Sequence, residues 1–351
     1  MLSRFTLSVL LAMTFTACSR SSNSPIPSQP PPSSPTNPPP LASPTDTTTN
    51  TTSGTDYRYW HVVSNGSISP LNDIWFTDTL HGFAAGYDGN IYLSSDGGSN
   101  WIRSALTETS GQGGVETLYF WDTQIGYAVG IAHVAVTANG GKNWTIKPRP
   151  DGLRTDNWPN LQFVSPTTGY LATGSGLWRT DDSANTWTKV ETDPAEALYF
   201  FNANTGFTFS FPNKINSTSS GGSAWQATGK VPLPPFQQGW AYLKFANDQA
   251  GWFTDETRVS ITTNGGTSWK SVFQSVSTNP IEDIELLSGQ TAYLATLKKL
   301  YKTVDGGVTW MDEYTISPTL YPKGRIIALY FTDDHHGWAC GDGGIVLRYR
   351  D

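Results

Sequence analysis

The chain has 351 residues and the composition of an all-β protein with many turns, because 13% of its residues are aromatic, only 15% are charged, and glycine and proline number 34 and 23. This composition argues against an α/β enzyme with long amphipathic helices. The net charge of −7 argues against a nucleic-acid partner, which requires a basic surface, and two cysteines exclude a disulfide-rich scaffold and a multi-cysteine zinc site.

The first 17 residues resemble a bacterial lipoprotein signal peptide. One arginine precedes an apolar or small-residue run over residues 5–17, which is too short to cross a hydrocarbon core of ~30 Å as a helix. The segment Phe15-Thr16-Ala17-Cys18 is similar to a lipobox, whose cysteine is lipidated after cleavage. The resemblance implies lipidation of Cys18 and attachment to a bacterial membrane, on the periplasmic side or at the cell surface. An ordinary signal peptide with an incidental cysteine is the alternative.

The next segment, residues 18–55, is predicted to be a disordered tether. Between Ser19 and Thr55 the chain contains 10 Pro, 9 Ser and 8 Thr residues, which cannot bury enough apolar surface to offset the entropy of ordering. Behind a lipidated cysteine, such a tether would hold a folded domain away from the membrane. We therefore expect the folded domain over residues 56–351.

The folded part repeats itself every 38–44 residues, as its tryptophans show. These are Trp60, Trp101, Trp144, Trp187, Trp225, Trp269 and Trp310. Six of them end an octapeptide, whose fullest copy is Ser94–Trp101, that resembles the Asp-box pattern S/T-x-D-x-G-x-x-W of BNR repeat proteins. The acidic position of the six copies is occupied by Asp96, Asn139, Asp182, Ser220, Asn264 and Asp305.

The Asp box is interpreted as a structural turn. Its Asp or Asn side chain accepts nearby backbone N–H groups, its glycine supplies a positive φ, and its tryptophan packs inward. Asparagine and serine can still hydrogen-bond the turn, whereas acid–base catalysis would not tolerate their exchange for a carboxylate. The six boxes therefore predict repeated structure rather than a catalytic centre.

A second pattern stands ahead of each box, with a phenylalanine or leucine six positions before a small residue that is followed by an aromatic one. Its copies are Phe76 with Gly82-Phe83, Phe120 with Gly126-Tyr127, Phe163 with Gly169-Tyr170, Phe200 with Gly206-Phe207, Phe245 with Gly251-Trp252, Leu286 with Ala292-Tyr293, and Phe331 with Gly337-Trp338. Alternating apolar residues predict a strand, a turn at the small residue, and a second strand. A third strand runs into the box, and the tryptophan opens a fourth. Four strands in about 42 residues are typical of a propeller blade.

Seven copies predict an all-β, seven-bladed propeller. The last copy ends at Asp351 without a box, and the missing strand is found at the other end of the domain, over residues 57–63. Pairing of this strand with Ile345–Tyr349 would close the ring and remove an exposed sheet edge. Cys340 lies in a predicted strand of the last blade, where we expect a small buried apolar side chain.

Copies such as the one from Ile74 to Trp101 resemble the photosystem II stability/assembly factor family, whose members are seven-bladed propellers and, in cyanobacteria, often lipoproteins. Non-photosynthetic bacteria have similar lipoproteins of unknown role. The resemblance covers residues 56–351 and implies a monomeric, non-enzymatic, membrane-anchored binding protein without cofactor or metal. Its partner would be a protein, including a membrane-protein complex, or a glycan. The family's arginine patch cannot be located in this sequence, so no functional residue is carried over.

An enzyme is the alternative, because Asp boxes also occur in sialidases and other glycoside hydrolases. No Arg-Ile-Pro segment precedes the first box, and the blade count is seven rather than six. Adjacent carboxylates at a suitable separation could hydrolyse a glycoside, although solvated strand ends and turns are the favoured interpretation. The pairs are Glu282/Asp283, Asp333/Asp334 and Asp255/Glu256. Ordinary loop histidines are likewise favoured over a metal site at His81, His335 and His336.

Partner binding is predicted on the loops that join the outer strand of one blade to the inner strand of the next, by analogy with other propellers. These loops span 102–114, 145–159, 226–240, 270–280 and 311–324. Their candidate contact residues are Arg149, Arg154, Trp158, Phe236, Trp240, Tyr314, Tyr321 and Lys323. For Trp158 and Trp240, packing between blades is an equally favoured role. Packing between blades, rather than ligand binding, is also predicted for Trp75, Tyr119, Tyr199 and Tyr330.

Overall fold

The computed structural model describes residues 59–65, 68–104, 114–130, 133–150, 159–191, 193–233, 239–317 and 324–350. The expected signal peptide over residues 1–17 and the expected tether over residues 18–55, with Cys18, lie outside the described residues and stay predictions. Within the described ranges, no helix is long and apolar enough to cross a membrane.

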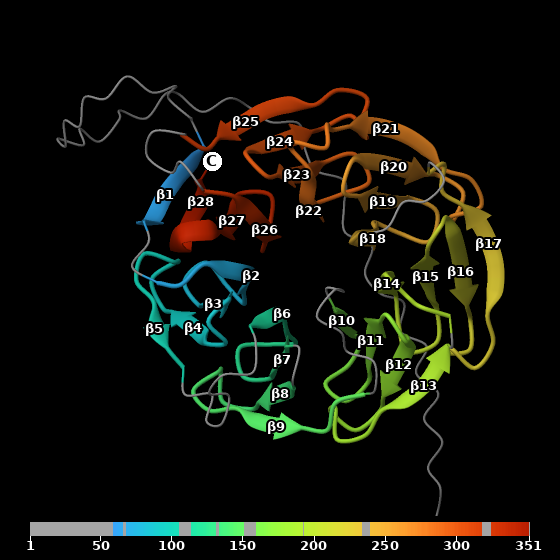
Figure 1. The fold of residues 1–351 in the computed structure, drawn as a ribbon, viewed down its shortest axis with the longest axis horizontal. Coiled ribbons are helices and arrows are strands. Elements are labelled where there is room, and N and C mark those ends of the chain that lie inside the picture. The colour runs from blue at the N-terminus through green and yellow to red at the C-terminus, as the bar shows by residue number, and fades with distance from the viewer. Residues whose placement is uncertain are drawn as a thin grey trace, which may run out of the picture. The chain divides into compact units, whose positions relative to one another are not determined.

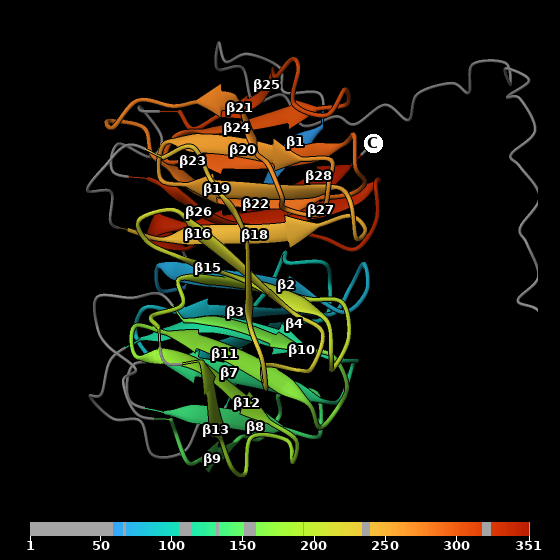
Figure 2. The same ribbon diagram turned by 90° about the vertical axis from the view of Figure 1, so that its right-hand side faces the viewer.

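Seven antiparallel sheets of four strands stand as blades around a central axis (Figure 1). In six blades the strands follow chain order from the innermost to the outermost. Viewed from its edge in Figure 2, the ring shows the sheets of neighbouring blades as successive layers. A short 3-10 turn, η1 (Asp342–Gly344), interrupts the strands of the last blade. This arrangement confirms the predicted all-β, seven-bladed propeller.

The strands of each blade have the following bounds. Blades one to three contain β2 (Leu71–Phe76), β3 (Gly82–Gly86), β4 (Ile91–Ser94) and β5 (Ile102–Arg103); β6 (Val115–Phe120), β7 (Gly126–Gly130), β8 (Val134–Thr137) and β9 (Thr145–Lys147); and β10 (Asn160–Phe163), β11 (Gly169–Thr173), β12 (Gly176–Thr180) and β13 (Thr188–Glu191). Blades four to six contain β14 (Ala197–Phe200), β15 (Gly206–Ser210), β16 (Lys214–Thr218) and β17 (Gln226–Lys230); β18 (Ala241–Phe245), β19 (Gly251–Asp255), β20 (Arg258–Thr262) and β21 (Lys270–Gln274); and β22 (Ile281–Leu286), β23 (Ala292–Thr296), β24 (Lys299–Thr303) and β25 (Met311–Thr315). Blade seven contains β26 (Ile326–Phe331), β27 (His336–Gly341), β28 (Ile345–Arg350) and β1 (Trp60–Asn65).

The seventh blade takes its outermost strand from the N-terminal end of the domain, as predicted. Its strand order is β26-β27-β28-β1, and Trp60 of β1 stands opposite Tyr349 of β28. The Trp60 side chain is buried and packs edge-on against Tyr293, Phe331 and Tyr349. Because β1 pairs with β28, the sheet edge of the last blade is covered and the ring is closed by residues from both ends of the domain.

The phenylalanine–glycine pattern explains how neighbouring blades hold together. In six blades the phenylalanine ring lies so close to the glycine of its own blade that an added Cβ would come within 2.3–2.6 Å of a ring atom. The aromatic residue after the small residue stacks on the phenylalanine of the next blade, with ring centroids 3.5–4.5 Å apart. The stacked pairs are Phe83–Phe120, Tyr127–Phe163, Tyr170–Phe200, Phe207–Phe245, Tyr293–Phe331 and Trp338–Phe76. The last of these pairs joins blade seven to blade one.

The sixth blade departs from this pattern at two positions together. Leu286 stands where the other blades have phenylalanine, and Ala292 stands where they have glycine. A leucine side chain fills less of the space above the small residue than a phenyl ring, so the alanine Cβ can be accommodated. Trp252 of the fifth blade has no phenylalanine to stack on and packs edge-on against Trp310.

The six Asp boxes form the turns between the third and fourth strands of blades one to six. In the first box, the Ser94 hydroxyl accepts the Gly98 N–H at 2.9 Å, and the Asp96 carboxylate accepts the Asn100 N–H at 2.9 Å. The residue at the position of Asp96 accepts the equivalent N–H at 2.8–3.0 Å in all six copies, whether it is Asp, Asn or Ser. Gly97 and Gly98 have φ values of 73° and 89°, a region that favours glycine.

The box tryptophans are less buried than the sequence suggests. Trp144 is buried, whereas the other five are half-buried. These five are Trp101, Trp187, Trp225, Trp269 and Trp310. The indole N–H of Trp101, Trp144 and Trp269 donates to a glycine carbonyl of its own box at 2.9–3.1 Å. The prediction that the tryptophan packs inward therefore holds only in part, and in three of the six boxes an indole hydrogen bond also stabilises the turn.

Candidate functional site

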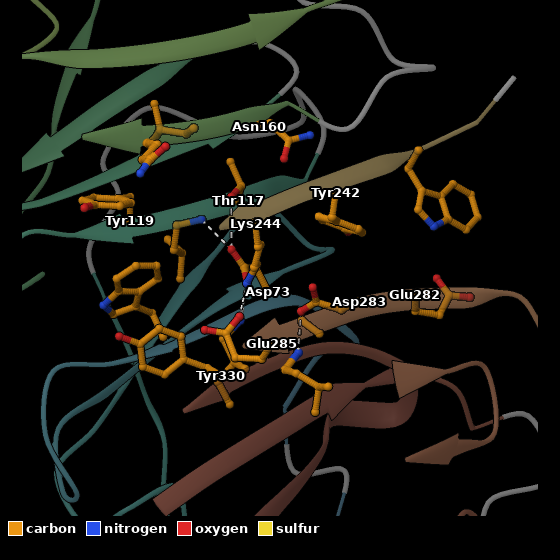
Figure 3. Close-up of a pocket in the computed structure, with 18 of the residues that line it drawn as sticks. Asp73, Thr117, Tyr119, Asn160, Tyr242, Lys244, Glu282, Asp283, Glu285 and Tyr330 are labelled. Carbon is orange, nitrogen blue, oxygen red and sulfur yellow. Dashed lines mark hydrogen bonds and ion pairs between the residues drawn. The ribbon is translucent and has the colours of Figure 1, made fainter. Parts of the chain in front are cut away.

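The inner strands surround a cavity of 610 Å³ at the centre of the ring (Figure 3). Its lining comes from β2, β6, β10, β14, β18, β22 and β26, so every blade contributes. The volume lies within the range of roughly 300–1,000 Å³ that is typical of ligand sites. Along each inner strand, apolar side chains pack between blades while the intervening positions reach the cavity, as the alternation of a β-strand requires.

One residue before each phenylalanine or its leucine replacement, the inner strands place a side chain that lines the cavity. The seven residues differ between blades and are Trp75, Tyr119, Gln162, Tyr199, Lys244, Glu285 and Tyr330. Trp75 packs against Tyr119 of the next blade and Tyr330 of the preceding blade, with ring centroids 4.9 and 4.5 Å apart. The predicted packing between blades is therefore correct for these contacts but incomplete, because the same aromatic residues form the cavity wall.

Four inner strands carry a β-bulge near their first residue, where two residues face one residue of the partner strand. The extra residues are Asn72, Glu116, Glu282 and Ile327, and all four line the cavity. A bulge re-aims a side chain that regular alternation would direct elsewhere. The chain enters the inner strands at this end from the loops that follow the outermost strands, so the bulged residues line the end of the cavity on this face, here termed its mouth.

Two carboxylates in the cavity wall connect neighbouring blades. Asp73 accepts the N–H of Leu118 in the next blade at 2.7 Å, and Asp283 accepts the N–H of Leu329 at 2.8 Å. Each carboxylate also accepts the N–H of the residue that follows it. Burial raises the pKa of Asp73 to about 7 despite these bonds, and burial raises the pKa of Asp283 as well. Both side chains therefore act as bridges whose oxygens are already engaged by backbone donors.

Lys244 reaches into the middle of this acidic cluster (Figure 3). Its ammonium forms an ion pair with Glu285 of the neighbouring blade. Burial lowers the pKa of Lys244, while the carboxylates of Asp283 and Asp73 act in the opposite direction. Burial also raises the pKa of the Tyr242 hydroxyl well above its usual value. One ammonium thus faces several carboxyl groups, and their negative charge is only partly compensated.

Glu282 lies at the mouth of the cavity and is 9% exposed. Among the residues that the structure describes, no group forms a hydrogen bond with its carboxylate. Burial raises the pKa of Glu282 to about 7, although the positive charge of Arg325 favours the ionised form. Arg325 is itself engaged by Asp342, with Nε at 2.6 Å from a carboxylate oxygen. Glu116 occupies the equivalent bulge of β6, and burial raises its pKa in the same way.

The three adjacent carboxylate pairs differ in their surroundings. The prediction of solvated strand ends is wrong for Glu282 and Asp283, which are 9% and 8% exposed, because the bulge places both consecutive side chains on the cavity wall. It is also wrong for Asp255, which is buried. Asp333 and Asp334 are exposed in the turn between β26 and β27, as expected.

The predicted contact residues are only partly within the described ranges. Those outside are Arg154, Trp158, Phe236, Tyr321 and Lys323. Arg149 is exposed beyond β9. Trp240 lines the cavity and donates its indole N–H to the Ile281 carbonyl of the next blade at 2.9 Å, so it joins two blades, while its role in partner binding stays a prediction. A surface contact at Tyr314 is wrong, because this residue lies in β25, is 6% exposed and packs into the core between blades six and seven.

No metal site is apparent in the described part of the chain, where no three His, Cys, Asp or Glu side chains gather suitably. The histidines considered for one pair instead with turn aspartates. His81 Nδ1 lies 2.8 Å from Asp78, and His336 Nδ1 lies 2.7 Å from Asp333. Cys340 is buried in β27, where burial raises the pKa of its thiol well above the usual value, and it packs as the small apolar residue that was predicted.

Fold and cavity together define a seven-bladed Asp-box propeller with an acidic and aromatic central site. Residues 52–198 match the family described as "Photosynthesis system II assembly factor YCF48". The chain is therefore a BNR-repeat propeller that resembles the photosystem II assembly factors, as the two repeated motifs indicate.

Two curated relatives carry the same description. The chain is 26% identical over 214 residues to "Photosystem II stability/assembly factor HCF136, chloroplastic" of Oryza sativa subsp. japonica, a match that covers 54% of this chain and 50% of the rice protein. It is 25% identical over 141 residues to "Photosystem II assembly lipoprotein Ycf48" of Synechococcus sp. (strain CC9902), covering 40% of this chain and 42% of that protein. The matches thus span half or less of the length of these relatives.

A solved structure supports the architecture over a longer range. The structure titled "YCF48 bound to D1 peptide" superposes with a TM-score of 0.66, at 18% sequence identity, over 84% of this chain and 98% of the other. At this identity the superposition shows a common fold. The function of this chain has to be argued from its own cavity.

Proposed function

We propose that this protein is a non-enzymatic, membrane-anchored assembly factor that binds a protein partner on the face where the central cavity opens. The observation that carries the proposal is the contrast within the inner strands. Positions that join blades repeat around the ring, whereas the cavity-lining position before each phenylalanine carries five residue types in seven blades, with Tyr in three of them. Variation inside a strictly repeated scaffold is the pattern of a binding site grafted on a fold.

The names of the relatives support a protein as the ligand. Both curated relatives are described as photosystem II assembly factors, and a structural neighbour is titled as bound to a D1 peptide. Transferred to this chain, that chemistry is recognition of a segment of a membrane protein during its assembly. Partner contacts are proposed on the face from which the chain enters the inner strands, because binding residues in propellers commonly lie on the connecting loops.

The cavity chemistry fits hydrolysis less well than binding. A glycoside hydrolase needs a carboxylic acid that donates a proton and a second carboxylate that acts as nucleophile or base. The oxygens of Asp73 and Asp283 are engaged by backbone N–H groups. Sialidases need a cluster of arginines, whereas Arg325 is the arginine that the described lining contains, and it pairs with Asp342.

Attachment to a membrane through Cys18 is part of the same proposal. It rests on the lipobox-like segment Phe15-Thr16-Ala17-Cys18 and on the cyanobacterial relative, which is named a lipoprotein. Stable anchoring requires more than one acyl signal, which a processed lipoprotein cysteine provides. Fatty-acid labelling that is strong in the wild type and absent in Cys18→Ser would support the anchor, and equal labelling of both proteins would remove it.

Capture of the partner tests the binding function. The tagged full-length chain is purified from detergent-solubilised membranes of its own host, alongside a tagged unrelated lipoprotein as the control. We expect a membrane protein to be recovered in near-stoichiometric amount with the wild type and not with the control. Recovery of no specific protein, together with turnover of any member of a glycoside panel by the purified chain, would contradict the proposal.

A further inference from the structure

The charge of the cavity lining is strongly unbalanced. Five carboxyl groups line it, from Asp73, Glu116, Glu282, Asp283 and Glu285. The cationic groups of the described lining are those of Lys244 and Arg325, and each already has a carboxylate partner. The formal excess of negative charge is held by low-dielectric walls, which strengthens its attraction for a cation that enters.

Glu282 shows that this charge is available to a ligand. Its side chain is nine-tenths buried and lines the cavity at the mouth. Within the described residues its carboxylate accepts no hydrogen bond, so both oxygens can accept donors from a ligand. An ammonium or guanidinium group at the mouth would supply the missing donors and the opposite charge. Glu116 presents a second carboxylate from the equivalent bulge of β6, so two blades aim acidic side chains at the same opening.

The aromatic residues of the cavity wall suit the stem of a long cationic side chain. Trp75 contacts Tyr119 and Tyr330 and, with Tyr199, forms an aromatic part of the wall. The methylene stem of a lysine or arginine packs on such surfaces, and the faces of the rings attract its cationic end. Acidic groups at the mouth and aromatic rings in the wall therefore select the same kind of ligand.

We propose that the central cavity binds a lysine or arginine side chain carried by an extended segment of the protein partner. The proposal deepens the binding function given above and rests on it. A segment is favoured over a free amine because the cavity, at 610 Å³, offers room for several residues. Charge complementarity selects the segment, and the aromatic wall holds its side chain.

Binding of a defined basic peptide tests this inference. The probe is a fluorescein-labelled (Gly-Lys)₄ octapeptide, and its counterpart has norleucine in place of each lysine, which keeps the stem and removes the charge. Fluorescence anisotropy is measured with the full-length protein at low ionic strength. We expect saturable binding of the lysine peptide, binding at least about tenfold weaker for the norleucine peptide, and a loss of about fivefold in Glu282→Gln and in Glu116→Gln.

A charge-matched control separates the cavity from the general surface. Asp248 is exposed in the turn between β18 and β19, so Asp248→Asn removes one negative charge outside the cavity. Its affinity for the peptide should equal that of the wild type. Thermal melts of all variants verify that they are folded. Equal affinities of wild type, Glu282→Gln and Glu116→Gln, an equal loss in Asp248→Asn, equal binding of the norleucine peptide, or no binding of either peptide would overturn the inference.

The two proposals can fail separately. If the wild type captures a membrane protein but binds both octapeptides equally, the protein-binding function stands and the basic segment is wrong. If the lysine peptide binds through Glu282 but no membrane protein is captured, the cavity has the proposed selectivity and the assembly function is wrong.

Discussion

Neighbouring positions on the inner strands of the propeller are used in opposite ways. The position of Phe76 is a phenylalanine in six of seven blades, whereas the position of Trp75, one residue earlier, is Trp, Tyr, Gln, Lys or Glu. The first side chain packs against the adjoining blade, and the second lines the cavity. One strand therefore serves assembly on one face and the central site on the other.

The difference follows from what each face has to meet. A side chain between blades must fit the aromatic residue that the preceding blade presents, so a closed ring repeats the same pair at nearly every junction. A side chain in the cavity meets residues from several blades at once and is not bound to any repeat. We infer that residues repeated in nearly every blade are required by the fold, whereas residues that vary between blades in the cavity are adapted to the ligand.

Among substitutions between blades, loss of the Trp60 side chain of strand β1 should lower stability most. Trp60→Ala removes a buried indole that packs against Tyr293, Phe331 and Tyr349, and should lower the free energy of unfolding by about 3–5 kcal/mol. Urea denaturation followed by circular dichroism measures the change. A loss under about 1 kcal/mol would mean that β1 does not close the ring.

A double-mutant cycle sharpens the comparison at a single junction. Gly169→Ala places a Cβ about where the Phe163 ring lies, within 2.6 Å, and should cost about 2–3 kcal/mol. Phe163→Leu should cost a comparable amount because it leaves a cavity. The double variant recreates the Leu286/Ala292 pair of blade six, so it should be more stable than the sum of the two losses predicts. Strict additivity would show that the two positions are not coupled.

Substitutions in the Asp-box turn should lower stability less, and the loss should depend on whether a hydrogen-bond acceptor is present rather than on its charge. Asp96→Ala removes the acceptor for Asn100 and should cost about 1 kcal/mol, whereas Asp96→Asn should remain close to wild type because Asn139 and Asn264 fill the same position elsewhere. Binding of the partner by the folded protein should survive both changes. An Asp96→Ala protein of unchanged stability that has lost a measured activity would contradict the structural role.

The Asp96 carboxylate should also make the stability of the protein depend on pH, with a sign that follows from its pKa. Burial alone would raise the pKa of Asp96, but hydrogen bonds from Asn100 and Ser94 lower it below the usual value. Its contribution to stability is therefore present above the unfolded-state pKa of about 4 and is lost as the pH falls through the folded-state pKa. The stability gap between wild type and Asp96→Ala should accordingly narrow in acid.

On the cavity face, the expected dependence of stability on pH has the opposite sign. Burial raises the pKa of Glu282 to about 7, with Arg325 opposing this rise and Glu256, Asp342 and Asp283 reinforcing it. The wild type therefore loses stability as the pH rises from about 5 to 8, because Glu282 must ionise in the folded state. Glu282→Gln removes this loss, so its melting temperature relative to wild type should increase over that range. An offset that is constant with pH would contradict this environment for Glu282.

The repeated features of the fold could be predicted from the sequence, because the motif behind each of them recurs in several blades. Seven copies of the phenylalanine pattern give the blade number, and the missing strand of the last copy gives the closure by residues near Trp60. The glycine of the pattern is small because the phenylalanine ring occupies the space of its Cβ, a reason that only the structure supplies.

The cavity could not be predicted in the same way, because the residues that line it vary between blades. The bulges at Glu116 and Glu282 shift the register of the inner strands by one residue, and nothing in the local sequence distinguishes them from solvated strand ends. The prediction of a surface contact at Tyr314 is wrong because the first residues of the expected loop over 311–324 form strand β25. A signal was nevertheless present in the variation at the position of Trp75, where a repeat for packing alone would have kept one residue type.

Site-specific photo-cross-linking tests the central claim most directly, that the partner binds in the cavity. A benzoylphenylalanine residue replaces Tyr199 on the cavity wall and, in a matched control, Ile102, which is 70% exposed on the outermost strand β5. Both full-length proteins are irradiated in membranes of the host and their adducts are identified by mass spectrometry. We predict an adduct with the same membrane protein that the wild type captures, formed at position 199 and not at position 102. An adduct at position 102 alone, or equal adducts at both positions, would contradict the account.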